Sequence, residues 1–120
     1  MPRDSRAYLV DIIEACDAIR SAVTGLTLDT YRTNRTIRSS VEREFIIIGE
    51  AMAALSRHAP HIFESITGSR RVVDFRNRLT HEYATLDDAL VWAVADRDVP
   101  LLHDECKVWI EKAGSSEDAH

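Results

Sequence analysis

The sequence predicts an all-α fold, an antiparallel bundle of four to five helices, from three observations. Apolar residues recur at steps of three and four along almost the whole chain, which is the period of an amphipathic helix. Four glycines and three prolines among 120 residues are too few for a turn-dense all-β protein. The length suits one compact domain, and the sequence shows no alternating apolar and polar run of convincing length for a strand.

The first helix is expected between Leu9 and Val23. Six apolar positions share one face at helical spacing: Leu9, Ile12, Ile13, Cys16, Ile19 and Val23. This stripe can face a core while the acidic residues between its members face water. Gly25 ends the helix, and Thr27 or Asp29 can cap the element that follows.

The second segment predicts a long amphipathic helix that ends near Arg57, ahead of Pro60. Its apolar face comprises Ile37, Val41, Phe45, Ile48, Met52 and Leu55. Ile46 and Ile47 widen this face beyond what one core needs. Such a helix is either buried at the centre of the fold or half of an interface between subunits. Because only about four helices are available to cover it, we favour the interface and expect a dimer.

A third helix is expected from about Arg70 to Tyr83, after a turn and cap supplied by Gly68 and Ser69. Its apolar positions are Val72, Phe75, Leu79 and Tyr83.

The fourth helix is expected to begin near Leu86, where Thr85 and Asp88 have the spacing of a capping arrangement. Pro100 lies inside this helix and should kink or split it. Residues 114–120 are expected to form a polar, disordered tail. The predicted domain therefore spans residues 1–113.

The chain carries 20 acidic and 15 basic residues, a formal net charge of −5 that argues against a nucleic-acid binder. The charge is unevenly distributed. Residues 30–86 hold nine arginines and six acids, whereas residues 87–120 hold nine acids and three bases. This separation indicates either a basic working surface beside an acidic one or ordinary solvated helix faces.

Cys16 and Cys106 are the only cysteines, and their spacing fits neither a disulfide framework nor a zinc site. Each is expected to be a small buried apolar residue. His58 and His61 are separated by Pro60, which breaks the helical geometry of a metal pair, so no metal site is expected. The sequence shows neither a signal peptide nor a membrane span, and a cytoplasmic protein is expected.

One short segment concentrates side chains that can handle a phosphodiester. Residues 76–83 read Arg-Asn-Arg-Leu-Thr-His-Glu-Tyr, and on a helix Asn77 and His81 stand one turn apart. The guanidinium of Arg76 can clamp a phosphate, and a histidine can exchange a proton near neutral pH. Phosphodiester cleavage needs that combination. The alternative is a polar helix terminus with a capping histidine, and the residues alone leave both open.

The same segment, Arg76 to Tyr83, resembles the R-x4-H-x-Y signature of HepT-type toxins, a HEPN-domain family also known as DUF86. The stretch from Ile46 to Ala51 is similar to the family's I-I-G-E-A stretch. Further positions fall where relatives carry them: Val41, Arg43, Leu86, Asp87 and Trp92. The resemblance covers residues 8–110. It departs at residues 68–75, where many relatives have a tryptophan and an acidic residue. The segment that leads into the motif is therefore longer or begins differently in this chain.

The resemblance implies a metal-independent, cofactor-free endoribonuclease that acts as the toxin of a toxin–antitoxin pair. Family homodimers bring two R-x4-H motifs into one cleft. By this resemblance Arg76 and His81 are the expected catalytic residues and Asn77 supports them. The implied partner is a minimal nucleotidyltransferase (MNT) antitoxin, which would transfer AMP to Tyr83 and so block the RNA cleft with bulk and charge.

Two alternatives stay open beside this reading. The chain could be a non-catalytic HEPN subunit that binds a nucleotidyltransferase or a nucleotide. Tyr83 could also be a structural residue, with its ring against Leu79 and its hydroxyl hydrogen-bonded.

Gly49 and Glu50 are expected to be structural. A glycine in mid-helix costs about 1 kcal/mol relative to alanine, so Gly49 indicates a close approach by another helix. Glu50 is expected to pair with an arginine such as Arg43 or Arg78 and hold the helices in register. The alternative for Glu50 is a functional carboxylate.

Overall fold

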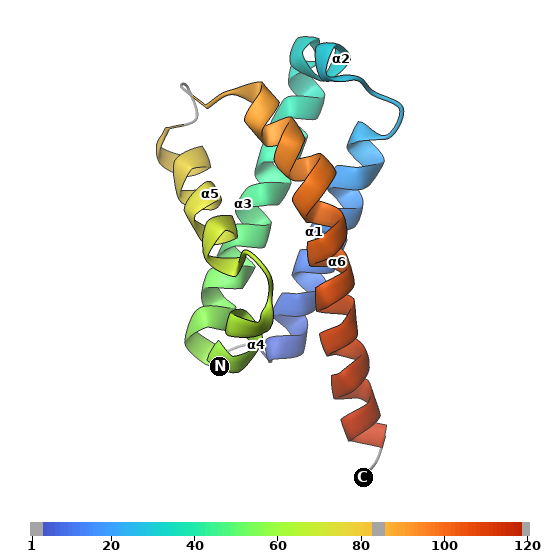
Figure 1. The fold of residues 1–120 in the computed structure, drawn as a ribbon, viewed down its shortest axis with the longest axis vertical. Helices are drawn as coiled ribbons and strands as arrows, with labels where there is room; N and C mark the ends of the chain where they lie inside the picture. The colour runs from blue at the N-terminus through green and yellow to red at the C-terminus, as the bar shows by residue number, and fades with distance from the viewer. Residues whose placement is uncertain (1–3, 83–85, 119–120) are drawn as a thin grey trace.

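The computed structural model describes residues 4–82 and 86–118, which form helices joined by turns. In order along the chain they are α1 (Ser5–Val23), α2 (Leu28–Thr33), α3 (Arg35–His58), α4 (Pro60–Ser65), α5 (Ser69–His81) and α6 (Asp88–Asp118). The all-α prediction is confirmed. Six helices are described rather than the four to five expected, because α2 and α4 are short helices at the two ends of the bundle (Figure 1).

The four long helices run alternately up and down, which is the predicted antiparallel arrangement (Figure 1). Helix α3 occupies the centre and packs against both α1 and α5, while α6 packs chiefly against α1. Helix α5 therefore rests on one face of α3 at the edge of the bundle. This helix carries the motif, so its single large contact decides where the candidate site lies.

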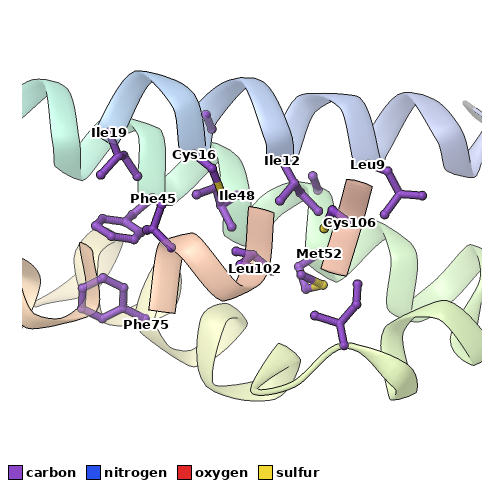
Figure 2. Packing of buried hydrophobic residues seen from close by; sticks show 14 of the residues in the cluster. Leu9, Ile12, Cys16, Ile19, Phe45, Ile48, Met52, Phe75, Leu102 and Cys106 are labelled. Atoms are coloured by element: carbon purple, nitrogen blue, oxygen red, sulfur yellow. The ribbon is translucent and has the colours of Figure 1, made fainter. Parts of the chain in front are cut away.

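The core forms where the apolar stripes of the long helices meet. Figure 2 shows side chains of α1, including Leu9, Ile12 and Ile19, turned toward Phe45, Ile48 and Met52 of α3, and all six are buried. Full burial of such a side chain stabilises the fold by about 1.5–3 kcal/mol. The ring of Phe75 meets that of Phe45 edge-on, with centroids 5.1 Å apart, and fastens α5 to α3.

Polar caps set where several helices begin. Thr27 and Thr30 form a reciprocal capping box at the start of α2, so Thr27 is the cap and the predicted choice between Thr27 and Asp29 is settled. Asn34 caps α3 through a 3.0 Å bond from the Ile37 amide. Asp87 accepts from the Ala89 amide at 2.9 Å at the start of α6. The predicted cap at Thr85 lies outside the described residues.

The start of α5 agrees with the prediction at Gly68 and differs from it at Ser69. Gly68 adopts a left-handed backbone with φ of 72° and stands at the N-cap position, while Ser69 is the first helical residue and is buried. Ser69 therefore does not cap α5. The left-handed turn explains the glycine, because a residue with a side chain is strained there.

Pro100 does not split the last helix, so of the two predicted effects the split is wrong and the kink stays a prediction. Helix α6 continues through Pro100 to Asp118. Buried residues on both sides of the proline, including Val99 and Leu102, hold the helix against the core, and the exposed position of Asp96 lets water reach the carbonyl that loses its partner. The helix also enters the segment predicted as a tail, and the domain boundary at residue 113 stays a prediction.

Both cysteines are buried, as predicted, Cys16 on α1 and Cys106 on α6. Burial raises the pKa of each thiol to about 12, so neither is a reactive thiolate near neutral pH. Within residues 4–82 and 86–118 no three histidine, cysteine or carboxylate side chains are grouped as a metal site requires. None of the helices in these ranges is long and apolar enough to cross a membrane.

The carboxyl of Glu42 on α3 predicts a pH effect on stability. Burial, reinforced by Asp88 and opposed by Arg38, raises its pKa in the folded state. Ionisation of Glu42 therefore costs folding free energy as the pH rises through about 4, the ordinary glutamate value, and above. We expect Glu42→Gln to increase the free energy of unfolding at pH 7 by less than about 1 kcal/mol, since the group is only partly buried.

Urea unfolding at pH 7 and at about pH 3.5 checks this expectation. The advantage of Glu42→Gln should shrink at the lower pH, where the carboxyl is protonated in both states. Glu44→Gln makes the same substitution on the same helix and is the matched control for the loss of one negative charge. A Glu42→Gln variant less stable than the wild type at pH 7 would contradict the assignment.

Candidate active site

The candidate site is built around Gly49 of α3, which has no side chain. A Cβ atom at Gly49 would overlap the Cβ of Arg76 and lie 2.6 Å from its Cγ, with the carbonyl oxygen of Val72 at 3.4 Å. Helix α5 therefore crosses α3 at this point with no space between them, which is the close approach the sequence predicts. Because the base of Arg76 sits directly on Gly49, the direction in which its side chain leaves α5 is fixed.

The end of Arg76 meets the carboxylate next to that glycine. Its Nη1 lies 3.6 Å from Oε1 of Glu50, and the side chains are 23% and 63% exposed. The arginine partner of Glu50 is therefore Arg76, and neither of the predicted partners, Arg43 and Arg78, takes that place. An ion pair with this much exposure contributes about 0–1 kcal/mol, so it orients the guanidinium without locking it.

Only the tip of Arg76 is available to a ligand. Its Nε is buried and has no hydrogen-bond partner among the described residues. Glu50 occupies one of the two terminal nitrogens. The terminal nitrogens are thus the donors that an incoming anion can reach, and Glu50 stands beside them.

Asn77 and His81 lie one turn apart on the exposed side of α5. His81 is the last residue of the helix. At 100° per residue, His81 stands about 140° around α5 from Arg76. One chain therefore presents the guanidinium and the imidazole on different faces of α5, although the sequence places them only five residues apart.

Thr80 lies one turn after Arg76 on α5. Its hydroxyl contacts its own helix, with the carbonyl oxygens of Arg76 and Asn77 at 3.2 and 3.0 Å. Such back-bonding to the preceding turn is common for threonine in helices. Tyr83 lies outside the described residues.

A groove of about 430 Å³ runs between α1 and α3 beside Glu50. Its walls include Arg43 and Arg57, and its floor includes Ile46 and Ile47. Both isoleucines are only partly buried. The widened apolar face predicted for this helix therefore lies on the surface next to the Glu50–Arg76 pair, and no other element of the described chain covers it fully.

Reasoning from sequence missed the direct link between Glu50 and Arg76. The available signal was the Gly-Glu pair in the middle of an apolar helix, because a glycine that admits a second helix also brings its neighbour close to that helix. Which arginine meets Glu50 depends on the crossing point of α3 and α5, and a single sequence does not state that point.

Comparison with known proteins gives consistent similarities. The family model described as "Ribonuclease HepT-like" matches residues 12–109. Two proteins of Methanocaldococcus jannaschii, each named "Putative RNase", are similar: one is 30% identical over 86% of this chain and 84% of its own, the other 29% identical over 88% and 96%. The "Probable ribonuclease HepT" of Thermococcus cleftensis is 28% identical over 85% of this chain and 92% of its own. No solved structure is detectably similar to the chain.

Proposed function

Because this chain belongs to the HepT-like ribonuclease family, we propose that it is a metal-independent endoribonuclease and the toxin of a toxin–antitoxin pair. The observation that carries the proposal is the placement of the motif on α5. Arg76 is seated on Gly49 with its tip exposed, and the exposed Asn77 and His81 follow on the same helix.

In the proposed reaction Arg76 binds the scissile phosphate. Its two terminal nitrogens match two phosphate oxygens, and its positive charge stabilises the additional negative charge of the pentacoordinate transition state. Because the base of the Arg76 side chain is already held in place, the side chain loses less conformational entropy when it binds the phosphate.

His81 is the proposed acid–base residue. The ribose 2′-OH loses its proton, its oxygen attacks the adjacent phosphorus, and the bond from phosphorus to the 5′-oxygen breaks, which leaves a 2′,3′-cyclic phosphate. His81 takes the first proton or supplies one to the leaving oxygen, and Asn77 orients His81 or the phosphate. The internal nucleophile makes RNA the substrate and excludes DNA.

The proposed active unit is a homodimer. Since Arg76 and His81 leave one α5 on different faces, a single phosphate is reached more readily by Arg76 of one chain and His81 of the partner. The partly buried Ile46 and Ile47 lie next to the Glu50–Arg76 pair and offer an apolar face for that contact. Two shallow half-sites would then form one cleft.

Regulation is proposed to act on Tyr83. A minimal nucleotidyltransferase antitoxin would bring ATP, the phenolic oxygen would attack the α-phosphate, and pyrophosphate would leave with transfer of AMP to the tyrosine. The added phosphate repels RNA and the added nucleotide fills the cleft. Mass spectrometry of the chain co-expressed with such a partner should find increments of AMP that map to Tyr83.

The decisive experiment is RNA cleavage by the purified chain in excess EDTA. We expect fragments that end in a 2′,3′-cyclic phosphate, and expression of the wild type but not of Arg76→Ala should arrest growth. RNA left intact across varied substrates, together with equally harmless wild-type and Arg76→Ala chains, would instead favour a non-catalytic binding subunit.

Glu50 should weaken RNA binding under this proposal. Its carboxylate lies 3.6 Å from the nitrogen that the phosphate needs, so the two anions compete for Arg76. We expect Glu50→Gln to tighten RNA binding by up to about fivefold, the equivalent of a surface ion pair of about 1 kcal/mol. Fluorescence anisotropy in a His81→Ala background measures binding without cleavage. Glu44→Gln makes the same charge change away from Arg76 and should bind as its parent does, whereas weaker binding by Glu50→Gln would make Glu50 a positioning residue.

A further inference from the structure

A second hollow lies on the other side of the motif helix. Helix α5 packs chiefly against α3, and α6 packs chiefly against α1, which leaves a cavity of about 370 Å³ between α5 and α6, called here the α5–α6 cleft. Its floor is apolar and includes Phe45, Ile48, Phe75 and Leu102. A cavity of this size with an apolar floor is typical of a binding site.

One end of the cleft is closed by hydrogen bonds. Oε1 of Glu105 on α6 lies 2.8 Å from the hydroxyl of Thr67, and Oε2 accepts from the Thr67 amide at 3.0 Å. Trp109 donates to the Ser65 hydroxyl at 2.8 Å. These bonds tie α6 to the segment that precedes α5, so the cleft has a rigid end and opens along the rest of its length.

The apolar surface of the cleft continues onto the outside of α6. Leu101 is 46% exposed and Val108 is 49% exposed, and they are the only exposed large hydrophobic residues among the side chains described. Val94, Leu101 and Val108 are each seven residues apart, so they lie along one side of α6 over about 21 Å. Val94 and Leu101 also line the cleft. These three apolar positions, with Asp98 and Glu105 between them, span the length of a helix of about four turns.

The two walls of the cleft carry opposite charges. Arg71 and Arg78 outnumber Asp74 on the α5 wall, and Asp98 is the charged residue that α6 contributes to the lining. An occupant with an acidic edge toward α5 and a basic edge toward α6 therefore complements both walls. Nucleic acid, whose backbone is negative along its whole length, does not complement the wall that carries Asp98.

We propose that the α5–α6 cleft, together with the stripe formed by Val94, Leu101 and Val108, docks an amphipathic helix of a partner protein. That helix has an apolar face of about four turns, acidic residues along one edge and basic residues along the other. This is the helix-in-groove mode of recognition, in which apolar anchors at i, i+3, i+4 and i+7 enter a groove.

Docking there would leave Arg76 open. Arg78 stands about 200° around α5 from Arg76, so the cleft and the Glu50–Arg76 pair lie on opposite sides of the helix. His81 stands only about 60° from Arg78, so the proposed partner would leave Arg76 uncovered and reach the edge of the helix face that carries His81. The inference goes beyond the proposed ribonuclease function and does not depend on it.

The test uses the full chain and a fluorescent synthetic helix of 18 residues, with leucines at the anchor positions, glutamates along one edge and lysines along the other. We expect saturable binding by fluorescence anisotropy. Leu101→Ser with Val108→Ser should weaken binding at least about tenfold, or about 1.4 kcal/mol. Lys107→Ser, at an exposed position of the same helix outside the stripe, is the matched control and should leave binding unchanged.

Charge reversal distinguishes specific docking from nonspecific hydrophobic binding. Arg71→Glu with Arg78→Glu should weaken binding of this peptide and strengthen binding of one whose glutamates are replaced by lysines. Circular dichroism confirms that each variant remains folded. Three results would overturn the proposal. The first is the absence of saturable binding, and the second is an equal loss of affinity in Lys107→Ser. The third is a smaller oligomer for Leu101→Ser with Val108→Ser in sedimentation, which would mean that the stripe contacts a second copy of this chain.

Discussion

Replacement of His81 by alanine is expected to reduce RNA cleavage by at least about 10²-fold, because a positioned acid–base group contributes about 10² to 10⁴ to such a reaction. The side chain is exposed at the end of α5, so its removal should leave the midpoint of thermal unfolding almost unchanged. Cleavage of a labelled RNA in EDTA measures the first effect, and circular dichroism during heating measures the second.

His58→Ala is the matched control for this prediction. His58 is also exposed and ends α3, but its ring stacks with that of Tyr8, with centroids 6.0 Å apart, away from the motif. This variant should cleave RNA as the wild type does. Equal activity of His81→Ala and His58→Ala would remove His81 from the reaction and leave Arg76 without its proposed partner.

Gly49→Ala is expected to lower both stability and activity, although alanine is the better helix former by about 1 kcal/mol. The new methyl group would overlap the base of Arg76, and insertion of a group into a packed contact costs about 1–3 kcal/mol. Helix α5 must then move away from α3. That movement displaces the guanidinium, so cleavage should fall even where urea titration shows the protein fully folded.

Ser39→Ala, at an exposed position of the same helix, controls for helix propensity and should be neutral or stabilising. A double-mutant cycle locates the clash. In Gly49→Ala with Arg76→Gly the Cβ of residue 76 is gone, so the double variant should be more stable than the sum of the two single changes allows. Strict additivity would mean that the two residues do not touch.

The sequence predicted the parts of this fold that depend on local spacing. Most of the two predicted apolar faces is buried, because the period of an amphipathic helix sets which side of it meets the core whatever its neighbours are. Ile13 and Val23 of the first helix and Ile37 of the second are only partly buried. The helices α2 and α4 were missed, since six residues contain too few periodic positions to recognise. Pro60 was interpreted only as the end of α3, although it also begins α4 as its first residue, where its missing amide proton costs nothing.

The motif predicted which residues form the candidate site, but not how they are arranged. The direction of Arg76 and its pairing with Glu50 follow from the crossing of α3 and α5, which is a tertiary contact. Pro100 shows the same limit of local rules. The rule for proline predicted a kink or a split, and the burial of both flanks of α6 keeps the helix from splitting.

The one-sided packing of α5 also sets the order in which the bundle can open. Helix α5 packs chiefly against α3 and buries only Phe75 and Leu79 among its described apolar side chains, fewer than α1, α3 or α6 bury. Local opening costs least where the fewest buried contacts break, so the amide hydrogens of α5 should exchange before those of α1 and α3. Among the long helices, the one that carries the motif is then the least expensive to displace, and a molecule bound on either side of it could change the population of its closed state.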